Sequence, residues 1–77
     1  MLSVPMTKLE RFLSENDLRP LDVAREAGVS RQHLLRVRKG TADPTRSAMV
    51  RIANGCSRLL GRRVKVATLF NIAVRWR

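Results

Sequence analysis

The chain has 77 residues and a formal net charge of +10, from 16 Lys and Arg against 6 Asp and Glu. This length allows one small domain with a modest core and leaves little room for an enzyme cleft. Basic residues are spread from Lys8 to Arg77 rather than confined to a tail, which favours a polyanionic partner over a merely solvated basic surface.

The cysteine content and the hydropathy of the chain indicate where in the cell the protein is expected. Cys56 is the only cysteine, so no disulfide can form within one chain, and its place in a helical pattern suits a small buried residue. No segment is apolar for the roughly 18 residues that a membrane span needs, and the first residues lack the pattern of an export signal. We expect a soluble cytoplasmic protein with an N-terminal extension over residues 1–6, one domain over 7–72 and a tail over 73–77.

The predicted elements are short helices. The first begins at Thr7, since Thr followed three residues later by Glu10 is a capping-box pattern. Residues 16–20 end this helix and begin the next, with Pro20 suited to a first helical position because it has no N–H to leave unpaired. Gly28 then occupies the position where a left-handed backbone would end the second helix.

Apolar spacing supports this second helix and predicts a third. Leu21, Ala24 and Ala27 recur at helical spacing in the second helix. The third helix covers about residues 30–39, with Ser30 as its N-cap. Its inner face carries Leu34 and Val37, and its outer face carries Gln32, Leu35, Arg36 and Lys39.

The segment from Val23 to Gly40 therefore reads as two short helices joined by a tight glycine-containing turn. This arrangement places a helix in the DNA major groove. Arg31 and Arg36 can each donate two parallel hydrogen bonds to guanine, and Gln32 can pair with adenine. We therefore predict a DNA-binding element.

Two further helices follow. Thr45 is expected to cap the fourth, whose apolar residues follow the i, i+3, i+4 rule: Met49, Ile52, Ala53, Cys56 and Leu60. Gly55 costs that helix about 1 kcal/mol relative to Ala, which indicates close packing there. Gly61 ends it, and the apolar segment 66–72 is predicted to form the fifth.

The last residues alternate apolar and polar side chains after Ala73, which indicates a short strand or arm. Three interpretations compete: a strand exchanged across a dimer, an arm held against DNA by Arg75 and Arg77, or a disordered end. We favour the dimer, because the apolar side chains near this end exceed what a five-helix core needs. The residues assigned to the dimer interface are Leu69, Phe70 and Trp76.

Nothing in the sequence favours catalysis or metal binding. The only histidine, His33, has no second imidazole with which to bind a metal. The carboxylates show no pairing suited to acid–base chemistry, and the sequence contains neither a Gly-rich phosphate loop nor a Ser/His/Asp set. We therefore expect no catalytic residue, metal, cofactor or small-molecule substrate.

A longer pattern runs through the predicted helices, formed by Ala24, Ala27, Gly28, Val29, Ser30, Leu34, Val37, Gly40, Pro44, Ile52, Ala53, Leu60, Gly61, Leu69 and Phe70. In this pattern the chain from Leu9 to Ile72 resembles the Cro/C1-type helix-turn-helix domains, the Xre family. The resemblance implies a compact all-α, five-helix, lambda-repressor-like domain that binds operator DNA, usually as a dimer, with the third helix in the major groove.

Carried over by position, the resemblance implies base contacts from Ser30, Arg31, Gln32 and Arg36, with His33 at the edge of that surface. It places Thr41 and Arg46 near backbone contacts. Arg38 and Lys39 suit phosphates by their own chemistry.

The chain also departs from the family pattern at two positions. Pro20 stands where such domains often carry Gln, and Leu35 stands where a polar residue is common. Leu35 can meet a thymine methyl group, a partner chain or water.

The leading hypothesis is a sequence-specific transcriptional regulator, in the form of a prokaryotic or phage repressor associated with the nucleoid. Two recognition helices about 34 Å apart would read a near-palindromic site. One alternative is an antitoxin-like module that docks to a protein and binds DNA secondarily. Another is a non-specific nucleic-acid binder, for which the evenly spread basic charge is the argument.

Overall fold

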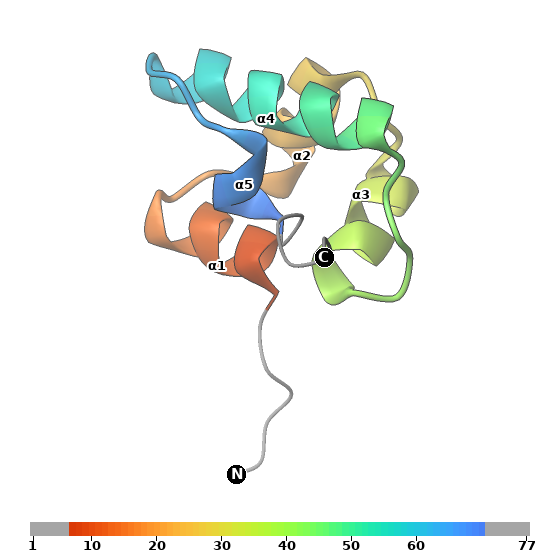
Figure 1. The fold of residues 1–77 in the computed structure, drawn as a ribbon. Helices are drawn as coiled ribbons and strands as arrows, with labels where there is room; N and C mark the ends of the chain where they lie inside the picture. The colour runs from red at the N-terminus through yellow and green to blue at the C-terminus, as the bar shows by residue number, and fades with distance from the viewer. Residues whose placement is uncertain (1–6, 71–77) are drawn as a thin grey trace, which may run out of the picture.

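The computed structural model describes residues 7–70, which form an all-α domain of five helices without a strand (Figure 1). The predicted all-α class is therefore confirmed for this part of the chain. The helices are α1 (Lys8–Glu15), α2 (Pro20–Ala27), α3 (Arg31–Lys39), α4 (Arg46–Leu60) and α5 (Val66–Leu69). The expected N-terminal extension over 1–6 and tail over 73–77 lie outside the described residues.

Helix starts follow the cap residues that the sequence indicated. In α1, α3 and α4 the cap hydroxyl accepts a hydrogen bond from the backbone N–H three residues later, over 3.0–3.1 Å; the caps are Thr7, Ser30 and Thr45. Helix α2 has no side-chain cap and begins at Pro20. Local chemistry therefore accounts for where these helices begin.

The core lies where α4 crosses α2, with α1, α3 and α5 packed around them (Figure 1). An ideal Cβ at Gly55 would lie 3.1 Å from the backbone nitrogen of Ala27, so the close packing predicted at Gly55 is confirmed. The buried apolar residues of the core are Leu9, Leu13, Val23, Ala24, Ala27, Leu34, Val37, Ile52, Ala53, Cys56, Val64 and Leu69.

One apolar residue of α2 differs from its expected place. Leu21 shares helical spacing with Ala24 and Ala27, but it is exposed, and Val23 is buried instead. Leu21 stands in the first turn of α2, where it lines an open groove beside α3 rather than the core. The buried stripe of α2 therefore begins at Val23.

The fifth helix is shorter than predicted. It ends at Leu69, because Phe70 has an extended backbone with φ −135° and ψ 148°. Lys8 donates a hydrogen bond to the carbonyl oxygen of Ala67 over 2.6 Å, which joins α1 to this short helix. Residues 71 and 72 of the predicted helix lie outside the described residues.

The packing of α5 leaves Leu69, one of the residues assigned to the dimer interface, inside its own domain. Leu69 is 1% exposed within its own domain, and Phe70 is half-buried against the same core. Leu69 therefore completes the core of its own chain and presents no surface to a second copy. Trp76, the third residue assigned to that interface, lies outside the described residues.

The described helices are short compared with a membrane-spanning helix, which needs about 20 residues. The longest helix between residues 7 and 70 is α4, with 15 residues, and none in that range is long and apolar enough to cross a membrane.

Candidate nucleic-acid interface

Helix α3 turns one continuous face to solvent. Its exposed residues follow the spacing i, i+1, i+4, i+5 and i+8, which lines one side of a helix: Arg31, Gln32, Leu35, Arg36 and Lys39. We call these five residues the α3 face. On the other side, Leu34 and Val37 are buried in the core, as predicted.

A tight turn sets the direction in which α3 leaves α2. Gly28 ends α2 with φ +74°, in the left-handed region that favours glycine. The N–H groups of Gly28 and Val29 both donate to the carbonyl oxygen of Ala24, over 2.9 and 3.1 Å. Val29 then packs against the core, and Ser30 caps α3. The short connection therefore holds the N-terminal end of the α3 face in place.

The structure brings three of the predicted base-reading side chains together on this face. Arg31, Gln32 and Arg36 are all exposed. Within residues 7–70, the arginines whose side chains form hydrogen bonds are Arg38, Arg58 and Arg62. The guanidinium groups of Arg31 and Arg36 are thus left free of partners in that part of the chain.

The other two predicted base-contact residues lie beside the α3 face. Ser30 is exposed, and its hydroxyl oxygen is used as the N-cap of α3, accepting from the N–H of His33 over 3.0 Å. The hydroxyl proton of Ser30 can still be donated elsewhere. His33 is half-buried at the edge of the face.

Arg38 has a structural partner that the sequence interpretation missed. Its Nη2 donates to Oε2 of Glu10 over 3.2 Å, and the two side chains are 19% and 21% exposed. The Thr7 hydroxyl also donates to the Arg38 carbonyl oxygen, over 2.7 Å. These contacts tie the end of α3 to the start of α1. The one sequence signal was Glu10 itself, which the capping-box pattern assigned to a local role.

The remaining predicted phosphate contacts surround the end of α3. Lys39 is exposed, and its Nζ lies 3.9 Å from Oε2 of Glu10. Thr41 donates its hydroxyl to the carbonyl oxygen of Arg36 over 3.2 Å, which closes the C-terminal turn of α3. Arg46 is exposed at the first position of α4. Both thus lie beyond the α3 face, Thr41 on the connection that follows α3 and Arg46 at the start of α4.

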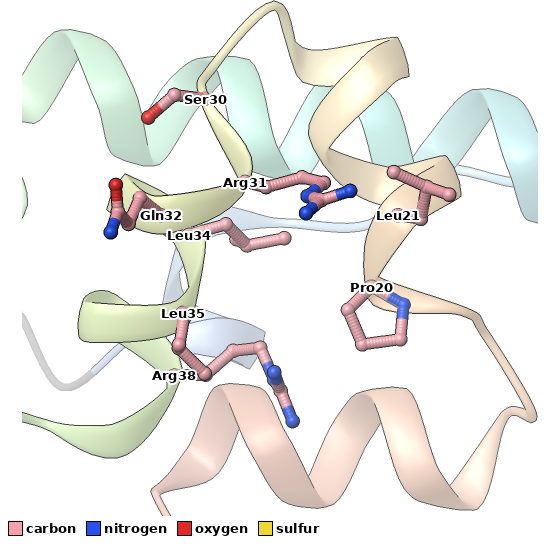
Figure 2. A pocket seen from close by; sticks show the side chains of 8 residues that line it. All are labelled: Pro20, Leu21, Ser30, Arg31, Gln32, Leu34, Leu35 and Arg38. Carbon is pink, nitrogen blue, oxygen red and sulfur yellow. The ribbon is translucent and has the colours of Figure 1, made fainter.

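An open groove of about 690 Å³ separates α3 from the start of α2 (Figure 2). Arg31 extends across it from α3 toward α2, and Leu21 and Leu35 are both exposed beside it (Figure 2). The residues that line this groove are Pro20, Leu21, Ser30, Arg31, Gln32, Leu34, Leu35 and Arg38. The α3 face therefore continues into a groove that sequence spacing did not indicate.

Side chains suited to metal or redox chemistry do not gather elsewhere in the described chain. Residues 7–70 contain no group of three or more His, Cys, Asp or Glu that could hold a metal ion. Cys56 is fully buried, as expected of a small core residue, and burial raises the pKa of its thiol to about 11. The thiol is therefore protonated near neutral pH.

Comparison of this chain with protein-family models, with curated proteins and with solved structures finds no match.

Proposed function

We propose that this protein is a sequence-specific DNA-binding regulator that inserts α3 into the major groove. The observation that carries the proposal is the α3 face, on which Arg31, Gln32 and Arg36 are exposed together on a helix that follows a tight turn. An α-helix fits the width of the major groove, and these side-chain types are the common readers of base edges there. The net charge of +10 favours approach to a polyanion.

Each exposed side chain has a specific role in the proposal. Arg31 and Arg36 donate bidentate hydrogen bonds to O6 and N7 of guanine, and Gln32 pairs with N6 and N7 of adenine. Each such pair discriminates against the wrong base by about 1–3 kcal/mol. Ser30 and His33, beside the face, contact bases at its margin.

Phosphate contacts would then set the register of α3 on the duplex. Lys39 and Arg46 are the exposed donors around the end of α3 and the start of α4. Thr41 lies between them, but its hydroxyl proton is already donated to the carbonyl oxygen of Arg36, so a phosphate contact from Thr41 would have to replace that bond. Arg38 has a different part in this scheme, because its guanidinium already binds Glu10 within the protein. It holds α3 in position, and phosphate contact falls to its neighbours.

The regulator is proposed to act as a repressor of the Cro/C1 type, with two copies on a near-palindromic site. Two-fold related recognition helices about 34 Å apart fit successive major grooves on one side of the duplex. Because Leu69 is buried in its own core, the contact between the copies must use other residues.

The test is selection from a random-sequence duplex pool at about 150 mM salt, a concentration that suppresses purely electrostatic binding. Enrichment of an inverted repeat is expected, and the spacing of its half-sites would support two bound copies. Retention without enrichment would point to non-specific coating. No retention at all would contradict DNA binding and favour a protein partner.

Two variants connect the selected sequence to α3. Gln32→Ala is expected to relax the preference at particular base pairs, because it removes a base-edge contact. Arg63→Ala is the charge control, since Arg63 is exposed and lies on the α4–α5 connection, away from α3 (Figure 1). It should leave the selected sequence unchanged. If both variants select the same sequence as the unmodified protein, Gln32 does not read bases.

A further inference from the structure

Two exposed leucines line the groove between α2 and α3. Leu21 is 46% exposed and Leu35 is 43% exposed, and both contribute to the walls of the same space (Figure 2). Single exposed leucines are common on protein surfaces and need no explanation. Here, however, Leu35 stands in the middle of the α3 face, whose other four members are polar or charged. Leu35 is therefore an apolar position within a face that otherwise suits polar contacts, and Leu21, on α2, lines the same groove from its other side (Figure 2).

The charge around this groove indicates what kind of molecule fills it. Arg31 lines it with a guanidinium that has no partner among residues 7–70, whereas the charge of Arg38 is paired with Glu10. No carboxylate is among the residues that line the groove in the described chain. A positively charged rim suits a polyanion. In the major groove of duplex DNA, the C5 methyl group of thymine is the apolar group on the edges of the bases. It is the feature of DNA that a leucine can recognise where an arginine or glutamine cannot.

We propose that Leu35, with Leu21 across the groove, contacts a thymine methyl group and makes this protein select thymine at one position of each half-site. This inference rests on the proposed insertion of α3 into the major groove. Leu35 follows Arg31 by four residues and Gln32 by three, so the three side chains lie on neighbouring turns of one face. The selected thymine therefore lies next to the bases that Arg31 and Gln32 read.

The size of the effect follows from burial of one methyl group. Taking one such carbon out of water is worth about fourfold in affinity. Replacing the critical thymine with uracil removes only this methyl group and leaves the base pair and its hydrogen bonds intact. Uracil replacement at that position should therefore weaken binding by about fourfold, and uracil at the other thymines of the site should leave the affinity unchanged.

The experiment uses the duplex most enriched in the random-pool selection, resynthesised with each thymine replaced in turn by uracil. Affinity is measured for the unmodified protein, for Leu35→Ala and for Leu35→Met. We expect the unmodified protein and Leu35→Met to lose affinity at one thymine per half-site, and Leu35→Ala to lose much less there, because most of the methyl contact is already absent in that variant. Leu21→Ala should also reduce the loss of affinity caused by uracil at that thymine, but by less than Leu35→Ala does.

The control variant is Leu59→Ala, which truncates an exposed leucine of α4 that does not line the groove. It should keep the full sensitivity to uracil. Circular dichroism and thermal melting would show that each variant is folded, as expected when an exposed side chain is truncated.

The outcomes separate this inference from the proposed function. If an enriched duplex is found but uracil is tolerated at every position, the methyl contact is wrong and the major-groove proposal stands. If Leu35→Ala is as sensitive to uracil as the unmodified protein, another residue reads the methyl group and the inference fails. If no duplex is enriched, the proposed function fails and this inference fails with it.

Discussion

Nη2 of Arg38 on α3 donates a hydrogen bond to Oε2 of Glu10 on α1, over 3.2 Å. The Thr7 hydroxyl adds a second link, to the Arg38 carbonyl oxygen. The C-terminal end of α3 is therefore held against α1, while the turn at Gly28 holds its N-terminal end. A helix fixed at both ends presents its outer side chains in one defined geometry, which recognition of base edges requires.

Removing the carboxylate of Glu10 should destabilise the fold. Glu10→Ala leaves the Arg38 guanidinium half-buried without its partner, and its Nε already has no partner among the described residues. Since the pair lies between the exposed and the buried cases, a loss of about 1–2 kcal/mol in the free energy of unfolding is expected. Urea denaturation followed by circular dichroism would measure it.

Glu26→Ala is the matched control for this prediction. Glu26 pairs with Arg58 over 3.1 Å, but the side chains of this pair are much more exposed, at 39% and 59%. Exposed pairs contribute about 0–1 kcal/mol. Equal losses in the free energy of unfolding for the two variants would show that the Glu10–Arg38 pair stabilises the fold no more than an exposed ion pair does.

A methyl group at Gly55 should push α4 away from α2. The added Cβ would lie 3.1 Å from the nitrogen and 3.3 Å from the Cα of Ala27, which are backbone atoms that cannot rotate aside. Overpacking of this kind costs about 1–3 kcal/mol, against a helix-propensity gain of about 1 kcal/mol. We expect Gly55→Ala to lower the melting temperature. Asn54→Ala, at the exposed neighbouring position of the same helix, should leave the melting temperature unchanged or slightly raised.

Alkaline pH should weaken the fold through Cys56. Burial raises the pKa of its thiol from 9.0 to about 11, so the unfolded chain loses this proton at lower pH than the folded chain. The contribution of the buried thiol is complete below pH 9 and is lost as the pH rises from about 9 to about 11. Denaturation curves across this range would measure the decline, which should be shallower for Cys56→Ala.

The same burial predicts slow thiol chemistry. A disulfide reagent at pH 8 should modify Cys56 only at the rate at which the protein unfolds, because the side chain is fully buried and protonated. Rapid modification of the folded protein would contradict the described packing around α4.

Salt dependence should distinguish a phosphate contact from a base contact. Lys39→Ala is expected to weaken binding to all sequences alike and to reduce the slope of log K against log salt by about 0.9, because one phosphate contact is lost. Arg36→Ala should instead relax preference at one base pair, by about 1–3 kcal/mol. Titrations of the selected duplex and a scrambled duplex at several salt concentrations would separate the two. Identical behaviour of both variants would mean that Arg36 does not read bases.

Local chemistry let the sequence alone predict where most helices begin and end. The caps Thr7, Ser30 and Thr45 each satisfy a backbone N–H three residues away, so their effect is complete within one turn. Gly28 likewise needs only its own left-handed backbone to end α2. The outer and inner sides of α3 followed from 3.6-residue periodicity, because the buried Leu34 and Val37 are one turn apart.

Only the tertiary structure decided which neighbour each side chain meets. Glu10 carries the same capping-box signal wherever α3 lies, yet packing of α1 beside α3 brings its carboxylate to Arg38. Leu21 has the spacing of a core residue, and the position of α3 leaves it in an open groove; Leu69 is buried because α5 returns to the core. Helix starts depend on interactions within a few residues, whereas burial and pairing depend on contacts between distant segments that no local pattern encodes.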